Sequence, residues 1–241
     1  MAAKVRTERD GSRTLILIGS AASVLEGDEL AVSLRVGPGA RLTVRSVAAQ
    51  LVHPCPGGGR GALTFDVEVG PGASLCWWPE PVVIAAGGRL RSRTTVACAA
   101  DAGLWWADEL VLGRSGEDRT DLGFDTSVRI DVDGRPVWRD GLSNAAGWTG
   151  PAAFGTARYV GSTLRLGPAG RPVPGGTAAP GPGAVPEPVG GESSGTGPVP
   201  VGPDPDPFDS GWLPLAAGGL LRRVLATDPT AGRARLGADG R

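Results

Sequence analysis

Four acidic side chains lie beside large aromatic residues or in a glycine-rich turn near the middle of this 241-residue chain. They are Glu80 in the run WWPEP, Asp108 and Glu109 just after Trp105-Trp106, and Glu117 at the end of the run GRSGE. Carboxylates next to tryptophans could line a groove or a passage. The alternative is that these four are solvated, or form ion pairs with the arginines of the same domain.

The single histidine, His53, is followed two residues later by Cys55. Two such ligands could hold a metal ion transiently, whereas a stable site needs three or four. The three cysteines (Cys55, Cys76 and Cys98) contain no C-x-x-C pair, and their odd number argues against a complete disulfide framework. A Ser-His-Asp triad would have to use His53, which no nucleophile elbow surrounds. We therefore expect no stably bound cofactor, and a small hydrolase using His53 stays open as an alternative.

Two glycine-containing motifs resemble binding loops only superficially. Gly-Pro-Gly-Ala, at 37–40 and 70–73, lacks both the G-x-G-x-x-G spacing and the Lys-Ser/Thr pair of phosphate-binding loops. The run DVDG, 131–134, opens like a calcium loop, but Pro136 and Leu142 stand where an EF-hand needs Gly and Glu. Both motifs are interpreted as turns between strands, and we expect no nucleotide hydrolysis.

The elements that must position these residues are predicted to be strands. Apolar and polar residues alternate with period two over Glu29–Val36, Ala62–Val69 and Arg89–Ala97, the pattern of half-buried strands. No comparable stretch of the domain keeps a helical period across three turns. Asp133-Gly134, between Val128–Val132 and Val137–Trp138, predicts a hairpin turn. The fold class predicted is all-β, with few helices.

A repeat underlies this pattern. VGPGARLTV at Val36–Val44 recurs as VGPGASLCW at Val69–Trp77, 33 residues later, and a weaker copy, CAADAGLWW, occupies Cys98–Trp106. Pro at the second and Gly at the third position of each Gly-Pro-Gly favour a type II turn. Strand–turn–strand units with a period of about 30 residues predict layered, solenoid-like stacked β-sheets that share one core.

Composition divides the chain into three parts. Between Gly167 and Pro207, 12 prolines and 11 glycines make up 23 of 41 residues. This segment has too few apolar side chains to offset the conformational entropy lost on ordering. We predict a β domain over 1–166, a disordered linker over 167–207, and a C-terminal segment, 208–241, whose short strand returns to the domain.

The net charge and the short length of the apolar runs limit which partners and locations are expected. The formal net charge of −1 gives no reason to expect nucleic acid or an anionic membrane as partner. The first residues, MAAKVRTERDG, have no apolar segment typical of a signal peptide, and no run approaches the roughly 20 residues of a membrane-spanning helix. We expect a cytoplasmic protein.

The order and spacing of several motifs resemble the UreD (UreH) family of urease accessory proteins. The motifs are Gly72-Ala73-Ser74-Leu75, Trp78-Pro79-Glu80-Pro81, Arg89-Leu90, Glu109 and Leu112–Glu117, with Leu25–Leu30 upstream and Gly218–Ala226 downstream. The resemblance implies a layered β fold and a non-enzymatic chaperone or scaffold. Members bind urease apoprotein and join a helical accessory subunit (UreF-like) and a GTPase (UreG-like). The assembly delivers nickel, along with carbon dioxide for the lysine carbamate, to the urease active site.

The resemblance gives the four carboxylates a specific role. Passing nickel on demands weak ligands, because a tight His/Cys site would trap the ion. Glu80, Asp108, Glu109 and Glu117 are therefore predicted to line a transient nickel passage or a partner surface. A β-solenoid surface protein with the Pro/Gly segment as its stalk stays open as another alternative, although it would need export.

Overall fold

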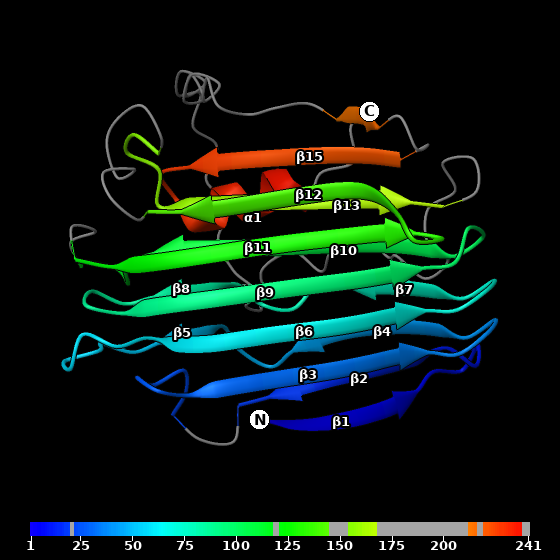
Figure 1. Ribbon diagram of the computed structural model, residues 1–241, viewed down its shortest axis with the longest axis horizontal. Helices are drawn as coiled ribbons and strands as arrows, with labels where there is room; N and C mark the ends of the chain where they lie inside the picture. Colours follow the sequence, from blue (N-terminus) through cyan, green and yellow to red (C-terminus); the bar gives the residue numbers. More distant parts are fainter. Residues whose placement is uncertain (20–21, 118–120, 145–153, 168–211, 216–218, 238–241) are drawn as a thin grey trace, which may run out of the picture.

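The computed structural model describes residues 1–19, 22–117, 121–144, 154–167, 212–215 and 219–237, and these residues form two facing β-sheets with one short helix (Figure 1). The larger sheet, sheet A, has ten strands: β1 (Ala2–Thr7), β2 (Arg13–Ile18), β4 (Arg41–Ser46), β5 (Gln50–Val52), β7 (Ser74–Trp77), β8 (Val82–Ile84), β10 (Gly103–Leu112), β13 (Tyr159–Leu166), β14 (Leu213–Leu215) and β15 (Gly219–Ala226). Its main path runs β1-β2-β4-β7-β10-β13-β15-β14.

The second sheet, sheet B, has five strands in the order β12-β11-β9-β6-β3. They are β3 (Glu29–Val36), β6 (Gly61–Val69), β9 (Arg89–Cys98), β11 (Gly123–Val132) and β12 (Arg135–Ser143). The helix, α1 (Pro229–Gly237), follows β15. The all-β, stacked architecture predicted from the alternation and the repeat is confirmed. Within the described ranges, no helix has the length and apolar character needed to cross a membrane.

The 33-residue repeat in the sequence corresponds to one layer of the stack. Val36 of β3 lies beside Val69 of β6, and Arg41 of β4 lies beside Ser74 of β7, all in parallel register. Parallel pairing continues through β9 and β11 in sheet B and through β10 in sheet A. Antiparallel strands end the stack at both sides, where β1 pairs with β2 and β13 pairs with β10.

The Gly-Pro-Gly turns connect the two sheets at one end of the layers. In each, the Ala N–H donates to the carbonyl of the first Gly, at 3.1 Å for Ala40 and for Ala73. Gly39 and Gly72 have φ of 66° and 61°, which only glycine adopts without strain. The third copy keeps the same closing hydrogen bond, from Ala102 N–H to the Ala99 carbonyl, without the glycine. The predicted hairpin at Asp133-Gly134 joins β11 to β12.

The core lies between the sheets in two apolar clusters. One cluster is centred on the stacked rings of Trp77 and Trp106, 4.6 Å apart and 5° from parallel, with Phe65 edge-on to Trp77. The other contains Leu63, Leu90, Leu110 and Phe124, among others. The inward positions of β6, β9 and β10 supply both clusters, as the two-residue period of those segments requires.

Sheet A is interrupted where sheet B is continuous. Opposite the nine residues of β6 and the ten of β9, sheet A has the pairs of short strands β4/β5 and β7/β8, separated by residues 47–49 and 78–81. β10, with ten residues, is continuous, and it pairs with both β7 and β8. The breaks leave an opening through sheet A.

Two predictions for the last third of the chain fare differently. The predicted linker, 167–207, lies outside the described residues from 168 onward, so the division into domain, linker and C-terminal segment stays a prediction. β15 pairs with β13 along its whole length and carries β14 on its other edge. The helix α1, which packs on β13 and β15, was not predicted.

Candidate functional site

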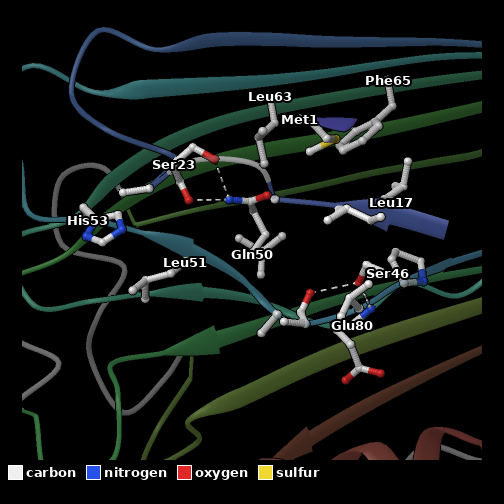
Figure 2. Close-up of a pocket in the computed structure, with 18 of the residues that line it drawn as sticks. Met1, Leu17, Ser23, Ser46, Gln50, Leu51, His53, Leu63, Phe65 and Glu80 are labelled. Carbon is white, nitrogen blue, oxygen red and sulfur yellow. Dashed lines mark hydrogen bonds between the residues drawn. The ribbon is translucent and has the colours of Figure 1, made fainter. Parts of the chain in front are cut away.

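The opening in sheet A is a cavity of about 340 Å³ with a largely apolar wall (Figure 2). Leu63 and Phe65 of sheet B form part of its wall, and Leu17 and Trp77 contribute from sheet A. Gln50 spans its rim, where the side-chain amide donates to the Ser23 carbonyl at 2.5 Å and to the Ser23 hydroxyl at 3.3 Å. These bonds tie β5 to the neighbouring segment around Ser23, which also pairs with β5 through Val24.

His53 also lines this cavity, beside Gln50 and Ser23 (Figure 2). Its backbone N–H donates to the Val24 carbonyl, which places the residue at the end of β5. Within the described ranges, no serine hydroxyl or carboxylate hydrogen-bonds the imidazole ring, and Cys55 directs its thiol to the backbone carbonyls of His53 and Arg89. In the part of the chain that the structure describes, the imidazole therefore has no hydrogen-bonded serine or carboxylate of the kind a catalytic triad uses.

Glu80 stands at the edge of the same cavity (Figure 2). Its backbone N–H donates to the Ser46 hydroxyl at 2.8 Å, so the turn between β7 and β8 is fixed to the end of β4. The carboxylate accepts two hydrogen bonds from the Arg233 guanidinium of α1, at 2.7 and 3.2 Å. Its side chain is 44% exposed, so this pair is open to water.

Asp108 lies in a second, smaller cavity of about 20 Å³ between the sheets. Its inward neighbours on β10, Trp106 and Leu110, belong to the two apolar clusters, so Asp108 falls between the clusters. The other polar residues of this layer come from five strands: Ser92, Thr126, Asp140, Ser162 and, beside them, Arg223. Val82 lines both this cavity and the opening in sheet A.

The Asp108 carboxyl titrates abnormally because of this position. Withdrawal from bulk water raises its pKa from 3.8 to about 6, and the Arg223 guanidinium opposes the rise. Asp108 nevertheless remains exposed to solvent, the one exposed residue of β10. Near neutral pH the layer therefore contains an ionised carboxylate that is open to solvent and interacts with the positive charge of Arg223.

Glu109, the next residue, points to the opposite face of sheet A. The Trp78 indole N–H and the Tyr159 hydroxyl each donate to its carboxylate at 2.7 Å. The Arg233 guanidinium approaches it to 3.8 Å, and only 2% of the side chain is exposed. Burial raises the pKa of Glu109, while Arg233, Tyr159 and Trp78 lower it. The carboxylate thus forms the centre of a buried polar network beneath α1.

Glu117 closes a turn and does not line either cavity. Its carboxylate accepts the backbone N–H groups of Ala86 and Arg114, each at 2.9 Å, and pairs with the Arg114 side chain. These bonds lower its pKa to about 2, the Arg114 side-chain hydrogen bond contributing most. The Arg158 guanidinium donates to the carbonyl of Glu117 at 2.6 Å, which ties the turn to the start of β13.

The structure therefore places the four predicted carboxylates in three environments. Glu80 and Glu109 share Arg233, Asp108 lies between the sheets with Arg223, and Glu117 is in the 113–117 turn. No group of three or more His, Cys, Asp or Glu side chains that could hold a metal occurs among the described residues. The role of the four carboxylates in metal passage stays a prediction.

Sequence reasoning missed the partners Asp140, Tyr159, Arg223 and Arg233. A signal existed for one of them. In the run GLLRRVLA, period two places Leu221, Arg223 and Leu225 on one face of β15, which would have predicted an inward arginine. Arg233 directly follows Gly232 in α1, whose sequence PTAGRARLG has Leu236 as its one large apolar residue. That segment shows no apolar periodicity, so no signal marked Arg233.

Comparison with known proteins gives one consistent result. The UreD urease accessory protein family matches residues 2–238. A protein of Parafrankia sp. (strain EAN1pec) named urease accessory protein UreD is 40% identical over 223 residues, which are 91% of this chain and 72% of that protein. Its namesake in Frankia casuarinae is 38% identical over 168 residues, 64% of this chain and 52% of that protein. A UreD 2 of Saccharopolyspora erythraea is 37% identical, covering 69% and 60%.

Proposed function

The chain belongs to the UreD family of urease accessory proteins, and on that premise we propose that it acts in urease maturation as a non-catalytic scaffold that binds apo-urease and helps deliver nickel to it. The family match over residues 2–238 carries this proposal. The chain spans 72%, 52% and 58% of the length of the first three relatives. Its partners and its nickel cargo are therefore proposed together with its role.

The two cavities support a route for the cargo. The opening in sheet A leads toward the space between the sheets, Val82 is common to both cavities, and an acidic residue lies at each: Glu80 at the outer cavity and Asp108 at the inner one. An ion that enters through the break in sheet A would meet Glu80 first and Asp108 next. Nickel is the substrate of this process and has no permanent place in the chain.

The chemistry of the route suits release. Carboxylates are harder, weaker ligands for Ni²⁺ than thiolates or imidazoles. The buried Cys76 and Cys98 line neither cavity, and His53 contributes a single imidazole to the outer one. Burial raises the pKa of the Cys98 thiol to about 12, so it is not a thiolate ligand at neutral pH. An ion would be held by few protein ligands at a time and could leave again.

The proposed partners are apo-urease, a helical UreF-like subunit and a UreG-like GTPase, in the cytoplasm. The chain has no phosphate-binding loop, so the GTPase would supply nucleotide hydrolysis. The Gly-Pro-Gly-Ala segments, which come closest to such a loop, are turns between layers. The chain would contribute surfaces and a passage.

The proposal is tested by reconstitution. Urease structural subunits and the other accessory proteins are expressed with and without this chain, and urease activity and co-purification of the chain with apo-urease are measured. We expect co-purification and an activity gain that requires the chain. Equal activity in its absence, with no co-purification, would refute the proposal.

A further inference from the structure

Arg223 extends from sheet A into the polar layer between the sheets. Along β15 its neighbours Val224 and Ala226 belong to the cluster under α1, so Arg223 lies on the opposite, inward face. Its guanidinium forms an ion pair with Asp140 of β12, in sheet B, and its Nε donates to the Ser162 hydroxyl at 3.1 Å. The side chains of Arg223 and Asp140 are only 34% and 17% exposed.

Asp108 of β10 lies on the same inward side of sheet A as the Arg223 guanidinium of β15, with β13 between the two strands. It is the direct register partner of Ser162, and Ser162 is the register partner of Arg223, so the three residues stand in one row across β10, β13 and β15. The Arg223 charge opposes the rise that burial causes in the pKa of Asp108, and the Asp108 charge opposes the fall that burial causes in the pKa of Arg223. Two carboxylates from opposite sheets therefore share one arginine between apolar layers. Two carboxylates around one positive charge are also the arrangement of a cation-binding site. Here the positive charge belongs to the Arg223 side chain.

The electrostatics of such a layer depend on the arginine. Two neighbouring carboxylates, one half-buried (Asp140) and one exposed (Asp108), repel each other and attract any available cation. A guanidinium supplies that charge permanently because it does not deprotonate in proteins. A divalent ion can then bind both carboxylates only by displacing Arg223, and the lost ion pair and hydrogen bond reduce its net affinity.

We propose that Arg223 is a built-in counter-ion that holds the place of a divalent cation beside Asp108 and Asp140 and keeps the affinity of this layer for such ions low. The inference rests on the proposed function, since a low affinity is what a passage for nickel needs. It assigns a specificity-determining role to a residue that is not itself a metal ligand.

The test removes the guanidinium and measures metal binding by the isolated full-length chain. Arg223→Met keeps the length and apolar stem of the side chain, and Ni²⁺ is titrated into it by calorimetry at pH 7. We expect at least about a tenfold tighter dissociation constant than for the wild type. The double variants D108N/R223M and D140N/R223M are the matched controls, and each should lose the gain. A folded Arg223→Met protein that binds Ni²⁺ no more tightly than wild type would overturn the proposal.

A second variant and a second readout guard against misfolding. Arg223→Gln keeps a donor for Ser162 and is titrated in parallel, and the thermal midpoint of each variant is recorded with and without Ni²⁺. Ligand binding to the native state stabilises it by mass action, so Ni²⁺ should raise the midpoint of the variants more than that of the wild type. No urease is present in this experiment, so its failure refutes the role of Arg223 alone, whereas failed reconstitution refutes the proposed function.

Discussion

An arginine lies beside each of the four central carboxylates, and the pairs differ in how far they are removed from water. The Glu109 side chain is 2% exposed, that of Glu117 18%, and that of Glu80 44%. Exposed ion pairs add little to stability, whereas a buried carboxylate that loses its donors or its counter-ion changes stability strongly. Replacing these carboxylates is therefore expected to change the free energy of unfolding by different amounts.

The pair Glu109 and Glu80 tests this difference, because both contact Arg233. Replacing Glu109 by Ala leaves the Trp78 N–H and the Tyr159 hydroxyl without their acceptor in a buried site, which we expect to cost about 2–4 kcal/mol. Glu80→Ala should cost no more than about 1 kcal/mol. Urea unfolding of both variants measures the two free energies, and equal losses would contradict the assignment of Glu109 as the buried centre.

Asp108 should make stability depend on pH. Its native pKa of about 6 lies above its unfolded value near 3.8, so the native state binds the proton more tightly between these values. Its contribution therefore favours folding below pH 3.8 and is lost as the pH rises to about 6. Asp108→Asn should remove this slope and stabilise the protein at pH 7 by no more than about 1 kcal/mol, since the side chain keeps contact with water.

The measurement is the thermal midpoint of both proteins from pH 4 to 7.5. The difference in midpoint between variant and wild type should grow between pH 4 and 6 and stay constant above. A difference that does not change across this range would show that Asp108 titrates like an ordinary surface carboxylate.

Sequence reasoning found these carboxylates but could not find their partners. The two-residue period puts Asp108 and Glu109 on opposite faces of one strand, yet which face is the core depends on the packing of sheet B. The arginine of Glu109 comes from a segment more than 100 residues later. Such contacts are set by the fold, and no local pattern records them.

At the scale of elements, α1 depends on a close approach to sheet A. Gly232 and Leu236 are its buried residues, and Gly232 packs against the ring of Tyr159. Arg233, beside it, reaches Glu80 and Glu109. Gly232, Leu236 and Arg233 all contribute to holding the helix, and only Leu236 is a large apolar residue, so the sequence shows a weak helical pattern.

Gly232→Ala should destabilise the docking of α1, although alanine is the better helix former. A Cβ at this position would lie 2.8 Å from Cγ of Tyr159 and 2.9 Å from Cβ of Ala226, so the helix or the ring must shift. We expect a loss of about 1–3 kcal/mol from this overpacking.

Ala231→Gly, at the exposed neighbouring position, is the control and should cost about 1 kcal/mol by helix propensity alone. Both free energies are measured by urea unfolding. A stabilised Gly232→Ala variant would mean that the helix does not lie this close to Tyr159.

The turn of residues 113–117 depends on Glu117. Its depressed pKa, about 2 against 4.5, means that its stabilising effect is complete above pH 4.5 and is lost as the pH falls toward 2. Glu117→Ala should expose the amides of Ala86 and Arg114, which then exchange with deuterium at least about tenfold faster. Amides within β11, far from the turn, serve as the internal reference. Unchanged exchange at both amides would contradict this role.

At the scale of the whole molecule, the repeat predicted the stacked layers because parallel neighbours 33 residues apart have matching sequences. The hairpin at Asp133-Gly134 was also predictable from its turn residues. The breaks in sheet A were not, because β5 and β8 have only three residues each, too few to show a two-residue period. The opening that these breaks create, and the polar layer around Asp108, depend on how the strands of successive layers align.

The central claim, that nickel reaches urease through the layer containing Asp108, is tested most directly by the nickel content of urease matured with variants of this chain. Asp108→Asn is compared with Asp125→Asn, the same change on the outer face of sheet B, where Asp125 meets Arg91. Urease is purified after co-expression with each variant, and its nickel is counted per active site by mass spectrometry. The account predicts a severalfold loss of nickel with Asp108→Asn, none with Asp125→Asn, and unchanged binding of urease by both. Full nickel loading with Asp108→Asn would contradict it.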